Sequence, residues 1–369
     1  MCKSIRGKVH YSGRWGRVVN GKMERLPGDG WREALEEYNR VRDDLYQGRT
    51  PRPRGGEGLT IAALCNHFLT SKDRLLAAGE LSPRTRYDYQ RTTDRLVAFF
   101  GRDRLVDDLT ASDFEALRAE MAKGVGAVRL AGDIQMSRSV FRYGWEAGLI
   151  DKPVRFGPTF RRPKLATIRK ARNRGAPRMF EAGEVRKLLD AAPTQRRAMI
   201  LLGVNCGFGN ADCGTLPITA VDLERGWINY PRPKTGIARR CPLWPETVAA
   251  LRDVLAERKP PKHEADAGLL FITARRVRWA KDSATPLSHE FRKLSEPWGL
   301  YRKGIAFYAL RHTFRTIAEE TRDQPAIDLI MGHTRHDMAS VYRERIADER
   351  LIAVTEHVRR WLFGGEASP

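Results

Sequence analysis

Between Leu59 and Ile150 the sequence reads as helix throughout, and this stretch most limits what the chain can fold into. Ser82 stands directly before Pro83, an order typical of an N-cap followed by the first residue of a helix. The helices are short and amphipathic, and their polar faces are basic. The sequence therefore predicts a compact helical domain over residues 58–150.

The segments on either side carry strand signals as well. Residues 1–57 contain Asn20-Gly21 between aromatic and β-branched residues, which favours a hairpin, followed by a helical pattern and a linker rich in proline and glycine. Residues 179–369 alternate helical patterns with two strand-like runs, GWINYPRP and KTGIARRCPL, which together predict a second hairpin. We therefore expect a mainly α fold with a small antiparallel β component (α+β). Its expected parts are a helical domain, a mixed helical and β-hairpin domain, and a small N-terminal hairpin-plus-helix region.

The charge balance indicates the class of partner. The chain has 66 Lys and Arg against 45 Asp and Glu, a formal net charge of +21. Such an excess of cations favours a polyanion, most often nucleic acid, although ribosomal and membrane-surface proteins are also basic. Residues 151–178 are especially basic, with a single acidic residue. This segment is either a solvated linker or a basic tether that lies along phosphates.

The cysteines and the apolar runs predict an intracellular protein without a metal. Cys206 and Cys213 have no second pair, and no histidine stands at zinc-finger spacing from them. We therefore expect no disulfide framework, no structural zinc and no cofactor. The first residues lack the apolar core of a signal peptide, and no run has the length and apolarity of a membrane span. The expected location is the cytoplasm, without a membrane partner.

The loop GFGNADCGTL, residues 207–216, follows the most apolar run of the chain, AMILLGV at residues 198–204. Its glycines are compatible with a phosphate-binding loop, and its cysteine is compatible with a redox or metal pair. A nucleotide-binding loop needs Gly-Lys-Ser/Thr, which this segment lacks, and a single Gly-x-Gly is weak evidence. The loop therefore needs another explanation.

A group of residues near the carboxyl terminus supplies that explanation. Arg311-His312 lies in ALRHTF, Gly332-His333 lies in LIMGH, and Tyr342 follows nine residues after His333. Each has an ordinary account by itself, as a surface cation, a helix-end histidine or a half-buried aromatic residue. Together, their order and spacing resemble the second-arginine motif and the histidine-to-nucleophile segment of the tyrosine recombinase (phage integrase) family.

A further turn fits the same family. Lys234-Thr235-Gly236, followed by Pro242-Leu243, resembles its catalytic lysine turn. The resemblance extends over roughly residues 59–362 and implies a domain plan. That plan is a possible arm-type DNA-binding region and linker (1–57), a helical core DNA-binding domain (58–150), a basic linker (151–178) and a catalytic domain (179–369).

The resemblance implies a site-specific recombinase or integrase that cuts and rejoins double-stranded DNA through a 3′-phosphotyrosyl intermediate, without a metal or cofactor. Tyr342 is then the nucleophile, because a covalent phosphotyrosine conserves the ester energy for rejoining. A free phenol has a pKa of roughly 10, so the attack needs cationic surroundings. Arg311 offers two parallel donors to the non-bridging oxygens, His333 offers another, and Lys234 is implied as the general acid. Family members act as tetramers on paired sites, so the implied partners are nucleoid DNA and further copies of this chain.

Two positions depart from the family pattern. Where members usually have Gly-Leu-Arg-x-x-Glu, this chain reads GFGNAD, so that Gly209 stands in the place of the first catalytic arginine and Asp212 keeps the acid. Tyr308 stands where the pattern before Leu-Arg usually has histidine, and its hydroxyl can still donate a hydrogen bond. Losing such an arginine costs on the order of 10²–10³ in rate. The chain is therefore either an active recombinase or a catalytically impaired, site-specific DNA-binding protein of the same fold.

Another arginine could compensate for Gly209. Arg315 lies four residues after Arg311, on the same face of a predicted helix, and Arg239 and Arg240 belong to the hairpin of Lys234. Our hypothesis is that one of these three supplies the missing guanidinium. The alternative is that they contact flanking phosphates.

The last predicted helix, Asp348–Leu362, resembles the segment that docks on a neighbouring subunit in the family. One of its faces is apolar and is formed by Leu351, Val354, Val358 and Leu362. Alternatively, this face packs on its own domain.

Overall fold

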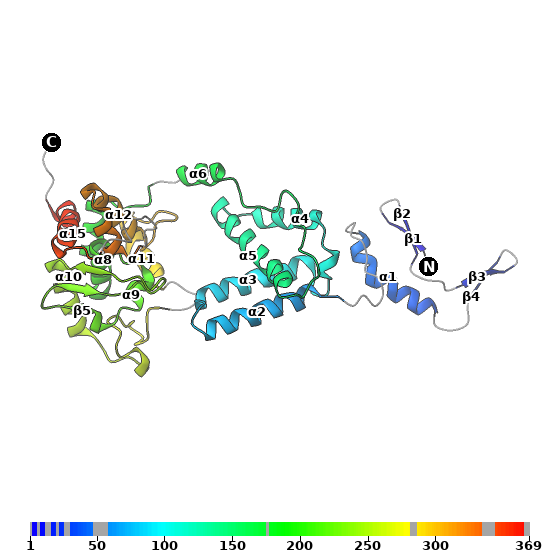
Figure 1. Ribbon diagram of the computed structural model, residues 1–369, viewed down its shortest axis with the longest axis horizontal. Coiled ribbons are helices and arrows are strands. Elements are labelled where there is room, and N and C mark those ends of the chain that lie inside the picture. The colour runs from blue at the N-terminus through cyan, green and yellow to red at the C-terminus, as the bar shows by residue number, and fades with distance from the viewer. Residues whose placement is uncertain are drawn as a thin grey trace. The chain divides into compact units, whose positions relative to one another are not determined.

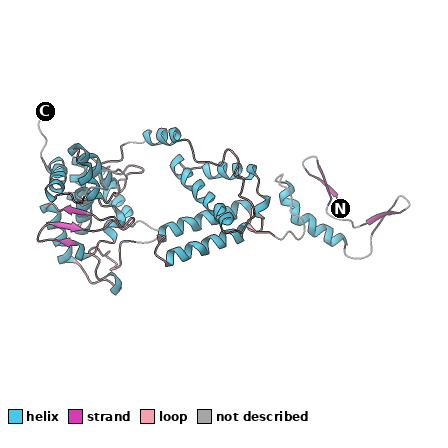
Figure 2. Cartoon of the chain, viewed as in Figure 1, coloured by secondary structure: helices cyan, strands magenta, loops and turns pink. Residues whose placement is uncertain are grey.

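The computed structural model divides into two compact units, formed by residues 1–81 with 85–173 and by residues 82–84 with 174–369 (Figure 1). The structure describes residues 2–5, 8–11, 16–19, 22–25, 30–46, 58–174, 177–280, 286–333 and 344–364. Helices dominate both units, and the strands are few and short (Figure 2). Within these described residues, no helix has both the length and the apolarity needed to cross a membrane.

The first described elements are four short strands and a helix. They are β1 (Cys2–Ile5), β2 (Lys8–Tyr11), β3 (Gly16–Val19), β4 (Lys22–Arg25) and α1 (Gly30–Tyr46). β3 and β4 form the hairpin that the Asn20-Gly21 signal predicts, with Val19 opposite Lys22, and β1 pairs with β2 in a second one. A small core joins Ile5 of β1 to Tyr38, Val41 and Leu45 of α1.

The helical part of the first unit follows from local signals in the sequence. Its helices are α2 (Ile61–Ala77), α3 (Pro83–Phe100), η1 (Val106–Asp108), α4 (Ala111–Ala122), α5 (Ala127–Glu146) and α6 (Leu165–Asn173). α3 begins at Pro83 as predicted. The core contains Phe100, Phe114 and Phe141, whose rings meet edge to face with centroids 5.2 to 6.3 Å apart.

Residues 151–173, for which the sequence allows either a solvated linker or a basic tether, pack on this unit. Phe160 is fully buried, and its ring stacks on that of Phe156 with centroids 5.7 Å apart. Arg138 of α5 holds the segment in place, since its guanidinium lies 4.4 Å from the ring of Phe156 and donates to the carbonyl of Phe160. The buried Phe160 and the partly buried Phe156 thus outweigh the charge of the residues around them.

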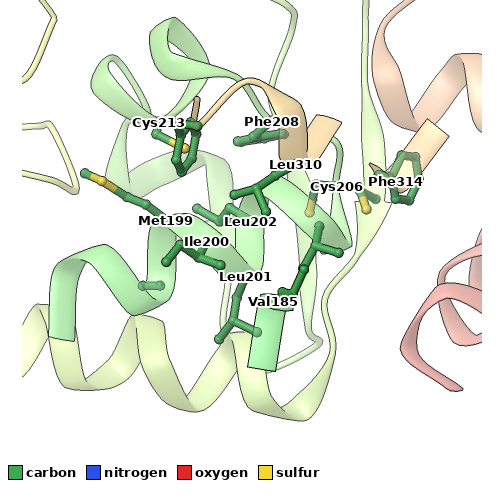
Figure 3. Packing of buried hydrophobic residues seen from close by; sticks show 14 of the residues in the cluster. Val185, Met199, Ile200, Leu201, Leu202, Cys206, Phe208, Cys213, Leu310 and Phe314 are labelled. Atoms are coloured by element: carbon green, nitrogen blue, oxygen red, sulfur yellow. The ribbon is translucent and has the colours of Figure 1, made fainter. Parts of the chain in front are cut away.

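The second unit is built around α8 (Thr194–Asn205), whose residues from Ala198 to Asn205 are all buried (Figure 3). Gly203 lets α12 (Ala309–Ala318) approach α8 closely, because a Cβ there would lie 2.9 Å from the Leu310 side chain. The other helices are α7 (Ala182–Ala191), α9 (Asn210–Gly214), η2 (Ile218–Ala220), α10 (Pro245–Glu257), η3 (Glu264–Asp266), α11 (Pro286–Ser295), η4 (Glu296–Trp298), α12 (Ala309–Ala318), η5 (Glu319–Thr321), α13 (Gln324–Met331) and α15 (Asp348–Phe363).

A three-stranded antiparallel sheet of order β5-β6-β7 lies in this unit. Its strands are β5 (Val221–Asp222), β6 (Trp227–Asn229) and β7 (Arg240–Pro242). Trp227 pairs with Pro242 and Asn229 pairs with Arg240, so the predicted hairpin of GWINYPRP and KTGIARRCPL is confirmed. The buried side chain of Asn205 ties α8 to the residues after β7, because it donates to the Pro242 carbonyl and accepts from the Trp244 amide.

The apolar face of α15 packs on its own domain. Leu351, Val354, Val358 and Leu362 are each at most 1% exposed and belong to the core of the second unit. Trp244 also donates from its indole nitrogen to the carbonyl of Thr355, 3.0 Å away. The expectation that this face docks on a neighbouring subunit is therefore wrong, and the alternative describes the structure.

Candidate active site

Arg311 lies at the centre of the site and is 3% exposed. It comes from the first turns of α12, and its guanidinium donates to the carbonyl of Gly207, after α8, and to that of Met331, at the end of α13, 2.8 Å away. Burial lowers the pKa of Arg311 to about 10, and the nearby charge of Arg232 adds to that effect. The group stays cationic at neutral pH, and among the described residues it makes no ion pair.

His333 lies against this guanidinium. Gly332 ends α13 in the left-handed region (φ 64°), and the chain then turns so that His333 Nε2 lies 2.8 Å from Nη2 of Arg311. Because arginine can only donate, Nε2 accepts, and the imidazole hydrogen is on Nδ1, 3.7 Å from the Asp328 carboxylate. Burial, followed by the charge of Arg311, lowers the pKa of His333. The structure thus brings together the two residues predicted from ALRHTF and LIMGH.

Asp212 of α9 links the GFGNADCGTL loop to the hairpin. Its Oδ2 accepts from the Gly209 amide at 2.6 Å, and its Oδ1 lies 3.0 Å from Nη2 of Arg239. Both side chains of this ion pair are buried. The Arg239 guanidinium also lies 4.4 Å from the Phe208 ring, and its Nε donates to the Tyr230 carbonyl. Arg239 is therefore held by the protein itself.

The ring of Tyr308 lies over Gly209. A Cβ at position 209 would be 3.0 Å from Cδ2 and Cε2 of Tyr308 and 3.3 Å from Oδ2 of Asp212. The backbone at 209 is extended, so the obstacle to a larger residue is this ring and not the backbone. Tyr308 is 45% exposed and meets His312 edge to face. Gly209 and Tyr308 are thus neighbours in space, a relation that the linear sequence does not reveal.

Lys234 is exposed on the turn between β6 and β7. The turn is closed at Arg232, whose carbonyl accepts from the amides of Thr235 and Gly236 at 3.1 and 2.8 Å. The base of the turn lies beside α13, because a Cβ at Gly332 would come within 3.1 Å of Cβ of Arg232. In the part of the chain that the structure describes, the Lys234 ammonium makes no hydrogen bond or ion pair.

Arg232 was not among the residues that the motifs single out. It is half-buried, and its charge lowers the pKa of both Arg311 and His333, which places it near both groups. The only sequence signal for it is its place two residues before Lys234 in a basic hairpin.

The other two candidate arginines are paired with carboxylates. Arg315 lies 2.7 Å from Glu319 and 2.9 Å from Asp328. Arg240 forms two hydrogen bonds with Asp348, at 2.7 and 2.6 Å, and its guanidinium lies 4.0 Å from the centre of the Trp227 ring. Tyr342, the predicted nucleophile, lies outside the described residues.

Comparisons with known proteins agree with this architecture. Residues 178–349 match the phage integrase family, and no curated protein matches the chain. A Tn1549 transposon integrase in complex with transposon right end DNA is 17% identical, with a TM-score of 0.59 over 81% of this chain and 99% of that one. A lambda integrase tetramer bound to a Holliday junction is also 17% identical, with a TM-score of 0.59 over 89% of this chain and 92% of that one. At these identities the similarity concerns the fold, which is that of a tyrosine recombinase catalytic domain joined to a helical domain.

Proposed function

We propose that this chain, whose residues 178–349 match the phage integrase family, is a site-specific DNA recombinase that cuts and rejoins double-stranded DNA without a metal. The observation that carries the proposal is the contact between Arg311 and His333 at 2.8 Å, beside the Lys234 turn. Among the described residues Arg311 has no carboxylate partner, and such a guanidinium suits the non-bridging oxygens of a phosphodiester.

In the proposed reaction, the Tyr342 hydroxyl attacks the phosphorus. The bond from its oxygen to phosphorus forms as the bond from phosphorus to the 5′-oxygen breaks, and the phenolic proton leaves to solvent. Lys234 gives a proton to the departing 5′-oxygen, while Arg311 stabilises the charge on the non-bridging oxygens. His333 becomes a second donor once the bound phosphate raises its pKa and Nε2 takes up a proton. The 3′-phosphotyrosyl bond keeps the ester energy for rejoining to a second 5′-hydroxyl.

The partners in this proposal are double-stranded DNA and further copies of this chain. Solved structures of the same fold include a transposon integrase with transposon DNA and a lambda integrase tetramer on a Holliday junction. We extend DNA binding and tetramer formation to this protein. It would then act as a homotetramer on paired DNA sites, in the cytoplasm and associated with the nucleoid. The net charge of +21 supports a DNA partner.

A second candidate function is site-specific DNA binding without efficient cleavage. The Tyr308 ring over Gly209 favours it, because this ring lies where the side chain of a first catalytic arginine would begin. The two candidates share the fold and the DNA partner and differ only in chemistry.

One experiment separates the two functions. The protein is incubated with a duplex selected for tight binding from a random-sequence pool and nicked at each position of the selected site in turn. A recombinase gives an SDS-resistant adduct that Tyr342→Phe abolishes, whereas a binding protein shifts the same duplex without forming the adduct.

The departures at 209 and 308 are tested on the same duplex. If the site is only impaired, Gly209→Arg combined with Tyr308→His forms the adduct faster than either single variant. If the site has been rebuilt around Tyr308, both single variants and the double variant are slower than the wild type.

A further inference from the structure

Cleavage of a phosphodiester concentrates negative charge on two non-bridging oxygens, and preorganised guanidinium groups stabilise it. Arg311 is one such group, but much of its donor capacity is directed at Gly207, Met331 and His333. A second cation is therefore needed, and position 209 does not supply one. This inference rests on the function proposed above.

Three arginines near the site are already committed to carboxylates. Arg239 pairs with Asp212 inside the protein, with its side chain 2% exposed, Arg315 pairs with Glu319 and Asp328, and Arg240 pairs with Asp348. To use any of them on DNA, an existing ion pair would first have to break. Breaking a buried ion pair such as that of Arg239 is strongly unfavourable.

Arg232 differs from all three. Its backbone closes the lysine turn, while its half-buried side chain makes no hydrogen bond or ion pair with the residues that the structure describes. Gly332 has no side chain, which leaves room for Cβ of Arg232 directly beside the turn that carries His333.

The positive charges around Gly332 favour the binding of an anion. Among the described residues, Arg311 and Arg232 are two guanidinium groups without a carboxylate partner, and both lie close to a histidine held in its neutral form. Mutual repulsion of this kind is relieved when an anion of matching geometry binds between the groups.

We infer that Arg232 contacts a non-bridging oxygen of the scissile phosphate and supplies the guanidinium that position 209 lacks. The cation thus reaches the phosphate from the base of the lysine turn instead of from the loop after α8. Two features of the structure fit this role for Arg232. Gly332 leaves room for Arg232 beside the site, and the Tyr308 ring over Gly209 occupies the space where an arginine at 209 would begin.

The first test measures single-turnover cleavage of the nicked duplex by Arg232→Ala and Arg232→Lys. We expect Arg232→Ala to be slower by about 10²–10³, with Arg232→Lys between it and the wild type, because lysine keeps the charge but not the paired donors. Arg225→Ala is the matched control, since Arg225 belongs to the turn between β5 and β6 and its side chain is 85% exposed. Wild-type cleavage by Arg232→Ala would overturn the inference.

A second substrate separates phosphate contact from a merely structural role. In this duplex a methyl group replaces one non-bridging oxygen of the scissile phosphate, which removes the charge that Arg232 neutralises. The deficit of Arg232→Ala should shrink to about tenfold or less. An equal deficit on both duplexes would show that the substitution acts through the fold and would overturn the inference.

A third measurement does not depend on cleavage. The imidazole signals of His333 are followed by NMR as inorganic phosphate is added to the full-length protein. We expect phosphate to raise the pKa of His333, and Arg232→Ala, but not Arg225→Ala, to weaken this response about tenfold. Unchanged phosphate binding in Arg232→Ala would exclude the contact. If the wild-type protein forms no adduct but shows the Arg232-dependent response, the proposed recombinase activity fails and the anion contact of Arg232 remains.

Discussion

Asp212 uses its two carboxylate oxygens for two different tasks. One accepts from the Gly209 amide at the start of α9, and the other faces the buried guanidinium of Arg239. The acid of GFGNADCGTL therefore serves the fold of the loop, whatever the chemistry of the site. Because both charges are buried, each depends on the other for compensation.

Replacing Asp212 by Asn should destabilise the protein, because it leaves Arg239 buried without a counter-charge. We expect a loss of about 3 to 5 kcal/mol in the free energy of unfolding, measured by urea denaturation. Asp348→Asn is the control, since its pair with Arg240 is partly exposed and should contribute about 0 to 1 kcal/mol. Equal losses in the two variants would contradict a buried ion pair at Asp212.

The protonation of His333 gives a prediction on pH. Its pKa is lowered in the folded protein by burial and by Arg311, while the unfolded chain has the ordinary value of about 6.5. The unfolded state therefore binds more protons, so this contribution to stability is present above about pH 6.5 and is lost as the pH falls below it. The pKa of His312 is lowered as well, so both residues contribute.

The measurement compares unfolding free energies between pH 7 and pH 5 in the wild type, His333→Gln and His312→Gln. Each substitution should flatten part of the acid slope. A His333 imidazole that titrates by NMR at or above pH 6.5 in the folded protein would refute the prediction.

Sequence reasoning reached some site residues and missed others for a physical reason. Arg311 and His333 belong to short motifs whose order can be read along the chain, and the structure brings them together. The Asp212–Arg239 pair and the Tyr308–Gly209 contact join segments that are distant in sequence, and no local pattern records which residues will meet. Arg232 stayed unnoticed because an arginine in a basic hairpin looks like any surface cation.

Among helices and strands too, features set by neighbouring residues could be predicted from the sequence, and features set by tertiary contacts could not. The start of α3 at Pro83 and the pairing of β6 with β7 depend on neighbouring residues, and both were predicted. The packing of residues 151–173 depends on Phe160 finding a pocket in a folded domain, which composition does not reveal. The face of α15 was recognised as apolar, but its partner could only be known from the tertiary structure.

Gly332 joins two elements, because it ends α13 and also touches the hairpin. Its φ of 64° disfavours other residues, and a Cβ would lie 2.7 Å from Cγ and Cδ of Arg239 and 3.1 Å from Cβ of Arg232. Gly332→Ala should therefore lower the free energy of unfolding more than Gly236→Ala. Gly236 has a similar φ of 68°, but a Cβ there meets nothing within 4 Å.

In Gly236→Ala only the backbone strain remains, about 1 to 2 kcal/mol. The excess loss in Gly332→Ala, read from chemical denaturation of both variants, measures the crowding of the hairpin against α13. If both variants lose the same free energy of unfolding, the side chains of Arg232 and Arg239 move aside without cost. The close approach of the hairpin to α13 then does not contribute to stability.

At the scale of the whole molecule, the net charge of +21 should govern how tightly the protein binds DNA. A protein that neutralises 6–10 phosphates loses roughly 10³–10⁵ in affinity between 50 and 200 mM salt. The reason is that binding releases counterions from the DNA, and this release is less favourable at higher salt concentration. We expect this protein to fall in that range with its selected duplex, measured by fluorescence anisotropy at several salt concentrations. Affinity that is constant over the series would contradict a phosphate-dominated interface.

The contact between Tyr308 and Gly209 also limits how this site can evolve. A mutation from glycine to arginine at 209 meets an aromatic ring, so its benefit depends on what stands at 308. The two positions are therefore expected to be coupled, so that the effect of an arginine at 209 depends on the residue at 308. Natural variants with arginine at 209 should accordingly have a residue other than tyrosine at 308.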